Sequence, residues 1–249
     1  MSLIDDIIEA ETTCFARFAN VEKRDFGLLY YTPDIPDSHD GNHAHILQPC
    51  DLNKAVDEIE DFYRTRNITP RIDHYSRPDQ GLSKQLREIL KDRGYQFVGE
   101  EYLFYVHRQP SQVKPVDGIS IRRVEEPLPA LLAMVEQTEN QRAMKVTRRS
   151  IQCPDFHLLV GFVDNQPVSM AGVEQPGPVG RVDEVLTAKP ARGKGYCSAV
   201  MDELVRYHSR VFGGELSLYT DNPVAARIYE KAGFEKLEGE VEFWSAWLE

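Results

Sequence analysis

The chain has 249 residues, of which 41% are hydrophobic and 10% are aromatic, and its formal net charge is −11. This composition supports a buried core in one large domain or in two domains of ordinary size. The acidic balance argues against a nucleic-acid partner, which needs clustered positive charge, and it permits a cationic substrate.

The four cysteines, Cys14, Cys50, Cys153 and Cys197, are scattered along the chain and form no CxxC pair. We therefore expect neither a disulfide framework nor a cysteine zinc site. We expect the protein to be located in a reducing compartment, the cytoplasm. No apolar stretch approaches the ~20 residues of a membrane-spanning helix, so no membrane partner is expected. The first six residues already include Asp5 and Asp6, whereas a signal peptide begins with a positively charged region.

Three histidines in the first half, His39, His43 and His45, resemble a metal cluster. No second pair of ligands accompanies them, which favours a polar loop that enters a strand. We predict no metal site here or elsewhere in the chain.

The end of the first half has the pattern of a helix at Leu82–Asp92, followed by Arg93-Gly94-Tyr95 and a strand-like run at Gln96–His107. The next segment, Arg108–Gly118, is polar, contains two prolines and ends in glycine, which is typical of a linker. It divides the chain into an N-terminal α/β domain, residues 1–107, and a second domain, residues 118–249.

The second half alternates between strand and helix patterns. We predict a strand at Ile119–Val124, helices at Leu128–Gln141 and within Gln141–Gln152, a hairpin of His157–Val163 with Pro167–Val173, a strand at Arg181–Thr187, a helix at Tyr196–Phe212 and a strand at Leu216–Thr220. Asn222 and Pro223 are suited to open a last helix, and Gly233 to end it. Phe234–Leu248 is predicted to form one strand pair that turns at Glu238-Gly239.

The end of the first half resembles the end of the second. Arg93-Gly94-Tyr95 and Ala232-Gly233-Phe234 both follow a helix and precede strand-like residues. We interpret this as a weak internal repeat in which the first copy lacks a Gly-rich turn.

That turn, Ala188–Ser198, joins a strand to a helix. Gly193 and Gly195 let successive backbone amides converge without obstruction, and a helix N-terminus adds a partial positive charge. Arg192 and Lys194 reinforce this charge, so the turn predicts a diphosphate site.

Three families of diphosphate-binding proteins use such turns. The Walker loop pattern is absent from this sequence. The dinucleotide-binding fingerprint is half present as Gly193, Gly195 and Ser198, with Asp221 where a ribose-binding acid would lie. Against it, several residues separate the strand from the first glycine, and antiparallel strands precede the turn.

The third family fits better. Arg192-Gly-Lys-Gly-Tyr-Cys197 resembles the R/Q-x-x-G-x-G/A signature of the GNAT superfamily of N-acetyltransferases, with Cys197 in place of the usual small final residue. Asn222–Phe234 is similar to the N-x-x-A-x-x-x-Y-x-x-x-G-F block of the same family. The resemblance covers residues 118–248.

This resemblance implies an α+β fold with a mixed, mostly antiparallel sheet whose central parallel strands splay apart. It implies that acetyl-CoA is the cosubstrate, with its pantetheine arm between those strands and its diphosphate on the turn. The residues implied in coenzyme binding are Val185, Leu186, Thr187, Arg192, Gly193, Lys194, Gly195, Tyr196, Cys197, Ser198 and Asn222. Asn222 would either bond the pantetheine or fix the turn between strand and helix.

Tyr229 matches the position of the general acid in many family members. Glu184 is our candidate for the general base because it lies on the strand beside the thioester. Simple alternation places Asp183 and Val185 on one face of that strand and Glu184 on the other, so Asp183 competes for the role. Glu174 is a further candidate.

The sequence thus predicts an enzyme that moves an acetyl group from acetyl-CoA to a primary amine by direct attack. The acceptor is expected to be a small-molecule or peptide amine. The first half is expected to form either a wall of the acceptor site or the contact surface of a homodimer. Two alternatives stay open: a non-catalytic protein that binds or senses acyl-CoA, and a Rossmann-type dinucleotide-binding enzyme.

Overall fold

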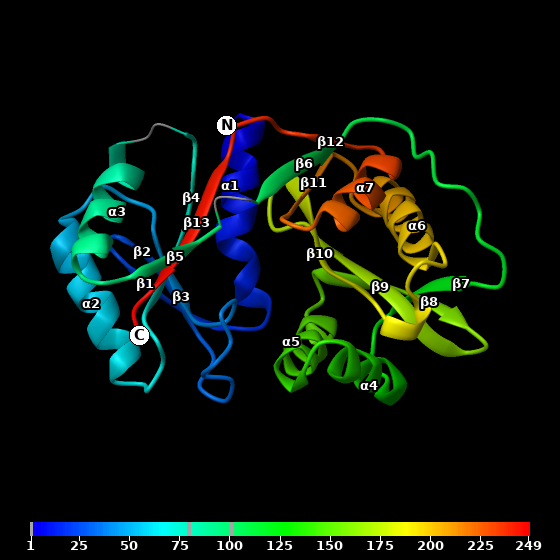
Figure 1. Cartoon of the computed structure of the whole chain (residues 1–249), viewed down its shortest axis with the longest axis horizontal. Helices are drawn as coiled ribbons and strands as arrows, with labels where there is room; N and C mark the ends of the chain where they lie inside the picture. Colours follow the sequence, from blue (N-terminus) through cyan, green and yellow to red (C-terminus); the bar gives the residue numbers. More distant parts are fainter. Residues whose placement is uncertain (1, 79–80, 100–101) are drawn as a thin grey trace. The chain divides into compact units, whose positions relative to one another are not determined.

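The computed structural model describes residues 2–78, 81–99 and 102–249. It divides into two compact units, each built on its own mixed sheet (Figure 1). The N-terminal unit comprises residues 11–102 and 239–249, and the C-terminal unit comprises residues 1–10 and 103–238. Helix α1 (Leu3–Thr13) runs across this boundary. None of the helices in the described ranges is long and apolar enough to span a membrane.

The sheet of the N-terminal unit has the strand order β1-β2-β3-β4-β13-β5. Its elements are η1 (Cys14–Arg17), β1 (Asn20–Arg24), β2 (Gly27–Tyr31), β3 (His43–Ile46), α2 (Leu52–Arg64), β4 (Arg71–Ser76), α3 (Gly81–Asp92), β5 (Gln96–Val98) and β13 (Glu242–Trp247). Strands β3 and β4 are parallel, and the other described pairs are antiparallel.

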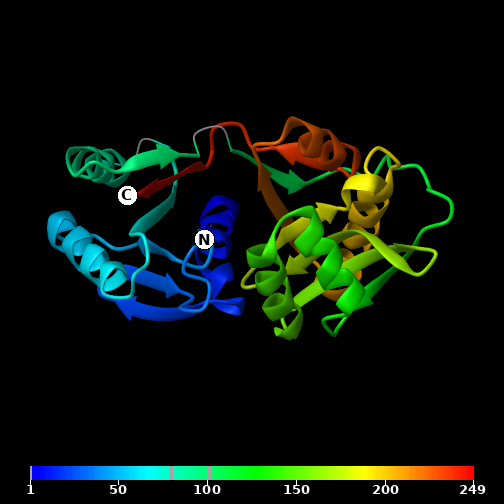
Figure 2. The same cartoon turned by 60° about the horizontal axis from the view of Figure 1, so that its bottom comes forward.

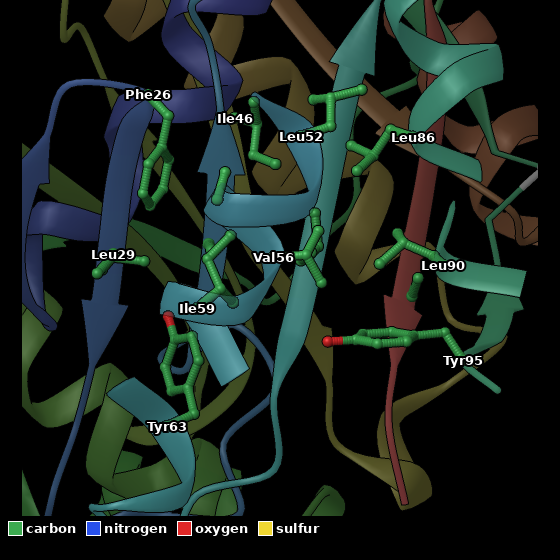
Figure 3. Close-up of a cluster of buried hydrophobic side chains, with 14 of the residues drawn as sticks. Phe26, Leu29, Ile46, Leu52, Val56, Ile59, Tyr63, Leu86, Leu90 and Tyr95 are labelled. Atoms are coloured by element: carbon green, nitrogen blue, oxygen red, sulfur yellow. The ribbon is translucent and has the colours of Figure 1, made fainter. Parts of the chain in front are cut away.

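The core of this unit lies between the sheet and the apolar faces of α2 and α3 (Figure 3). Val56 and Ile59 of α2 and Leu86 and Leu90 of α3 are fully buried there. Their spacing of three and four residues places them on one side of each helix. The aromatic anchor on the sheet is Trp244 of β13, which is also fully buried.

The sheet of the C-terminal unit has the order β12-β6-β11-β10-β9-β8-β7. Its elements are β6 (Leu103–His107), β7 (Ser120–Val124), α4 (Pro129–Thr138), α5 (Gln141–Gln152), β8 (Phe156–Val163), β9 (Gln166–Glu174), β10 (Val179–Thr187), η2 (Lys189–Ala191), α6 (Tyr196–Val211), β11 (Glu215–Thr220), α7 (Pro223–Lys231) and β12 (Phe234–Lys236). The predicted helices and strands of residues 119–233 are confirmed, including the β8–β9 hairpin.

Helices cover both faces of this sheet. One apolar cluster joins α6 and α7 to one face, and a second joins α4 and α5 to the other. Figure 2 shows α4 and α5, in green, on the near side of the sheet. The hairpin between β8 and β9 turns at Asp164 and Asn165, which both have positive φ, as a two-residue hairpin turn requires.

The two halves of the chain exchange one strand each. β6 follows the elements of the N-terminal unit in sequence, yet it pairs with β11 and β12 of the C-terminal unit. β13 follows the C-terminal unit, yet it pairs with β4 and β5 of the N-terminal unit. Each sheet is therefore completed by a strand from the other half of the chain.

This exchange reveals the internal repeat. Strands β1, β2, β3, β4 and β5 occupy the same order in their sheet as β8, β9, β10, β11 and β12 in theirs, and the exchanged strand lies before the last position in both. In each copy a helix connects the parallel pair, which is β3–β4 in one and β10–β11 in the other. The repeat inferred from sequence is therefore confirmed, and it extends over most of each copy.

Two expectations differ from the structure. Phe234–Leu248 does not form one strand pair, because β12 pairs with β6 whereas β13 pairs with β4 and β5. Segment 108–118 is not a free connection between halves, because it belongs to the C-terminal unit and its backbone bonds there. The compact units consequently have other boundaries than 1–107 and 118–249.

A fragment of residues 118–249 tests the exchange. This fragment lacks β6 and carries β13 without its sheet, so the edges of β11 and β12 are open. We expect it to aggregate or to lack cooperative thermal unfolding, measured by circular dichroism and size-exclusion chromatography. Residues 103–238, expressed alone as the matched control, should retain more native-like circular dichroism. A folded monomer of 118–249 would contradict the exchange.

Candidate functional site

The Gly-rich turn lies between β10 and α6 in the C-terminal unit. Gly193 and Gly195 have φ values of 77° and 82°, a region that favours glycine. Gly195 occupies the N-cap position of α6, where no side chain caps the helix. Residues 192–195 are exposed. The first turn of a helix presents amides that need an acceptor, so this geometry suits a bound anion.

The strands that lead to this turn separate at their carboxyl ends. In the described part of the chain, β10 pairs with β11 at Val179, Gly180 and Arg181 only. Beyond Arg181 the two strands diverge, although β10 continues to Thr187 and remains paired with β9. The backbone of Val185–Thr187 therefore faces a gap in the ladder, as expected from sequence.

A β-bulge accompanies this divergence. The register between β10 and β9 shifts between Asp183 and Leu186, and Glu184 has a φ of 51°, which is uncommon for a residue with a side chain. Val185 consequently packs against the cluster under α6 and α7, and Leu186 against the cluster under α4 and α5. The simple alternation predicted from sequence, with Asp183 and Val185 on one face, is wrong because the bulge inserts one residue.

A buried ion pair holds the bulge. Nη1 of Arg181 lies 2.7 Å from Oδ2 of Asp183 and 3.7 Å from Oε1 of Glu174. Oδ1 of Asp183 accepts a hydrogen bond from the amide of Glu184 at 2.8 Å. Both oxygens of Asp183 are therefore engaged, and Glu174 is only 5% exposed. Asp183 and Glu174 face Arg181, whereas Glu184 stays the predicted base. The side chain of Glu184 is partly exposed, as that of Asp183 is, and both of its carboxylate oxygens are buried.

Tyr229 of α7 lies in the cluster between the helices and the sheet, with 7% of its surface exposed. Burial raises the pKa of its hydroxyl well above the ordinary value, and the nearby Cys197 and Asp183 raise it further. The hydroxyl therefore stays protonated at neutral pH and can donate a hydrogen bond.

Cys197, in the first turn of α6, contacts a residue that sequence reasoning missed. Its thiol bonds to the hydroxyls of Thr187 and Ser169, which lie 2.8 Å from each other. Ser169 also donates to the carbonyl of Leu186 at 3.1 Å. Burial raises the pKa of the thiol, so Cys197 stays a neutral thiol that links the helix to β9 and β10. Only the register of β9 against β10 could have pointed to Ser169.

Asn222 caps α7, since its side-chain oxygen accepts hydrogen bonds from the amides of Val224 at 2.9 Å and Ala225 at 3.4 Å. Of the two roles considered for Asn222, the structure shows the one that fixes the turn between β11 and α7. Gly233 ends the region with a φ of 97°, as predicted.

The comparisons with known proteins agree with this geometry. Residues 126–234 match the model of the acetyltransferase (GNAT) family. This part of the chain belongs to the GNAT family. The matched residues include the turn, the splayed strands and Tyr229, so these features lie inside the GNAT domain. No curated protein sequence matches the chain significantly.

Solved structures resemble the chain over both halves. A GCN5-related N-acetyltransferase from Kribbella flavida is 17% identical with a TM-score of 0.71, over 99% of this chain and 96% of that one. One from Sphaerobacter thermophilus is 17% identical with a TM-score of 0.56, over 92% and 75%. A tandem GNAT protein from the clavulanic acid biosynthesis pathway is 13% identical with a TM-score of 0.60, over 82% and 75%. At these identities the likeness shows the fold.

The doubly wound alternative does not fit this GNAT domain. Its motif strand β10 has one parallel neighbour, β11, and one antiparallel neighbour, β9. A Rossmann-type sheet places parallel strands on both sides of such a turn.

The N-terminal copy of the GNAT fold has a different connection at the position of the turn. Residues 47–51 join β3 to α2 there, a shorter loop than residues 188–195 in the other copy. Asp51 caps α2, and its carboxylate accepts from the amides of Asn53 and Lys54 at 3.1 and 3.2 Å. A fixed carboxylate thus occupies the helix N-terminus where an anion would bind, which agrees with the expected loss of the diphosphate site.

The histidine cluster of the first half is a buried pair. His43 and His45 lie on β3 with their Nε2 atoms 3.0 Å apart, and Nδ1 of His45 lies 2.8 Å from the carbonyl of Asp73. Since a carbonyl only accepts, His45 donates from Nδ1 and accepts at Nε2 from His43. Burial lowers the pKa of each imidazole to about 3, so both are neutral. Among the described residues, no group of three or more potential ligands is placed to hold a metal ion.

A shallow cavity of about 490 Å³ lies in the N-terminal unit between α3 and the start of β13. Ser83, Lys84, Arg87 and Glu242 are among the residues that line it. Oε2 of Glu242 accepts from Ser83 at 3.2 Å, and its Oε1 lies 3.5 Å from Arg87. None of the residues that line this cavity belongs to the Gly-rich turn.

Replacement of Arg181 by alanine tests the ion pair. The variant leaves Asp183 and Glu174 beside each other without the guanidinium, and breaking a buried pair typically costs ~3–5 kcal/mol. We expect a loss of this size in the free energy of unfolding, measured in urea. Arg210→Ala is the matched control, because Arg210 is exposed in its pair with Glu203 and should cost less than ~1 kcal/mol. Equal losses in the two variants would contradict the role of Arg181.

Proposed function

We propose that the C-terminal unit transfers an acetyl group from acetyl-CoA to a primary amine by direct attack. The observation that carries the proposal is the conjunction of an uncapped, Gly-rich helix N-terminus with a pair of splayed parallel strands and a buried tyrosine. Each feature has a matching part of the substrate: the diphosphate, the pantetheine and the departing thiolate.

The diphosphate would bind on the amides of Gly193–Ser198. Gly193 and Gly195 keep the path to these amides open, and the positive end of the α6 dipole favours negative charge there. Arg192 and Lys194 are exposed next to the turn and supply two cations. Arg192 also donates from Nε to the carbonyl of Thr187 at 3.3 Å, which ties the turn to the end of β10.

The pantetheine would lie along Val185–Thr187, where β10 has no partner strand on the side of β11. Its amide groups can pair with this backbone in the way an added strand does. The bulge at Glu184 marks where the strand turns away from β11, so the thioester would lie beside it.

The reaction needs a neutral amine. A lysine-like amine has a pKa near ~10.4 and is mostly protonated at pH 7. Glu184 would accept the excess proton, directly or through water. The nitrogen lone pair then attacks the thioester carbonyl, the C–N bond forms, and the C–S bond breaks as its electron pair returns to sulfur. The nitrogen of the new amide gives up its second excess proton to the solvent.

Tyr229 would donate a hydrogen bond to the departing sulfur. A thiol has a pKa near ~8.5 in solution, and burial holds the pKa of Tyr229 well above that of an ordinary tyrosine. Full proton transfer from Tyr229 is therefore uphill, and its main effect is to stabilise the developing thiolate. The proton that completes free CoA comes at the end from the solvent or from Glu184.

The acceptor is proposed to be a small-molecule or peptide amine. The net charge of −11 favours the approach of a cation over that of an anion. Holding both reactants in place can by itself lower the barrier by ~7–11 kcal/mol, so the acid and base groups need supply only part of the acceleration.

Coenzyme binding and thiol release test the proposal together. We expect CoA at ~100 times its dissociation constant to stabilise the protein by about 2.7 kcal/mol in thermal unfolding. NAD should give no stabilisation. A panel of primary amines with acetyl-CoA should release free thiol, detected with a chromogenic disulfide. Binding of CoA with no turnover on any amine would favour a sensor of acyl-CoA, and stabilisation by NAD alone would overturn the proposal.

Tyr229→Phe separates the hydrogen bond from packing, because it keeps the ring in the buried cluster. We expect kcat to fall by ~10²-fold or more with a small change in KM. Since the pKa of Tyr229 is raised, the wild-type rate should increase with pH as the amine loses its proton and show no decline up to about pH 10. An unchanged kcat in the variant would remove Tyr229 from the mechanism.

The two copies of the fold predict the stoichiometry. Because the connection between β3 and α2, residues 47–51, is short and contains no glycine, with Asp51 as the helix cap, we expect one CoA per chain by titration calorimetry. Gly193→Val should abolish or strongly weaken this binding, since a β-branched residue at a φ of 77° distorts the turn. Asp51→Ala should leave the stoichiometry at one. Two equivalent sites per chain would contradict the assignment.

A further inference from the structure

The segment between β6 and β7, residues 108–118, crosses the C-terminal unit from α7 to the Gly-rich turn. The amides of Arg108 and Gln109 donate to the carbonyl of Gly233 at 2.9 and 3.0 Å. The amide of Gln112 donates to the carbonyl of Lys231 at 2.8 Å. We call residues 108–118 the crossing segment. It is fixed at its start to the end of α7.

The crossing segment leaves no room for a side chain at Gly233. A Cβ atom built there would lie 1.9 Å from the carbonyl oxygen of Gln109. The glycine that ends α7 is therefore needed twice, for its φ and for this close approach. Such an anchor holds the following residues in a defined path.

Two half-buried valines lie along this path. Val113 packs against the apolar cluster under α6 and α7. Val116 lies farther along, and its Cγ2 is 3.1 Å from the position that a Cβ of Gly195 would take. The side chain of Val116 therefore packs against the α-carbon of Gly195, within the turn.

This contact is important because the turn has little other support at its glycines. Gly195 is the N-cap of α6 and makes no side-chain capping bond. Around the Cβ position of Gly193, no described atom lies within 4 Å. Two glycines of positive φ in an exposed loop permit many alternative conformations, and binding a diphosphate requires the amides to converge.

We propose that Val116, near the end of the crossing segment, is a positioning residue for the Gly195 turn of the coenzyme site. This inference rests on the proposed function, since it assigns to Val116 the preorganisation of the diphosphate-binding amides. The contact limits the conformations of the turn before the coenzyme arrives. Apparent affinity falls in proportion to the fraction of molecules in the competent conformation, so loss of the contact raises the dissociation constant.

Val116→Ala tests the proposal in the full-length protein, with CoA as the probe in titration calorimetry. We expect the dissociation constant to rise by about 3- to 10-fold. Val113→Ala is the matched control, because it removes the same two methyl groups from the same segment without touching the turn. It should lower the thermal midpoint by as much as Val116→Ala but leave the dissociation constant within about 2-fold of wild type. Val116→Thr, which keeps the branched shape, should restore the affinity.

A double-mutant cycle with Gly195→Ala supplies a readout that a purely structural role would not move. Gly195→Ala adds a methyl group toward Val116, so its effect on the dissociation constant should be smaller in the Val116→Ala background than in wild type. Additive effects, or equal losses of affinity in Val113→Ala and Val116→Ala, would overturn the proposal while wild-type binding of CoA still stands. If the wild type does not bind CoA, the proposed function fails first.

Discussion

The buried guanidinium of Arg181 lies where β10 stops pairing with β11, and the proposed coenzyme site depends on the carboxylate of Asp183 that it holds. Asp183 pairs with it through one oxygen and accepts the amide of Glu184 through the other. This arrangement keeps a glutamate at positive φ, a conformation that a side chain disfavours. The strand therefore bends away from its neighbour and leaves backbone groups without a ladder partner. A continuous pair would have bonded those groups internally and left none for the proposed contact with pantetheine.

Features with local causes could be predicted from the sequence. Gly193 and Gly195 suit the positive φ values of the turn, and Asn222 suits a helix start, where backbone amides need an acceptor. The helices and the β8–β9 hairpin follow from periodicity and from the two-residue turn at Asp164-Asn165. Each of these signals is contained in a few neighbouring residues, so it survives without knowledge of the fold.

Features that depend on distant partners could not be predicted. The bulge is formed by Glu184, and a glutamate within a strand pattern does not predict a positive φ. Ser169 contacts Cys197 only through the register of β9 against β10. β6 and β13 have ordinary strand sequences, and their exchange is decided by which sheet offers an open position. The choice between Asp183 and Glu184 as base likewise depends on Arg181, which pairs with Asp183. The bulge decides which side chains share a face of β10, and the sequence does not show the bulge.

The exchanged strands also constrain how such a protein can evolve. After a duplication, a copy that loses its ligand site is usually free to decay or to be deleted. Here the copy with Asp51 in place of a phosphate cradle still supplies β6 to the sheet of the other copy, and receives β13 in return. Selection for the proposed chemistry of one half would therefore preserve the fold of the other, even without a second coenzyme site. The N-terminal copy is then kept for its structural contribution, and its surface residues are free to change toward another role.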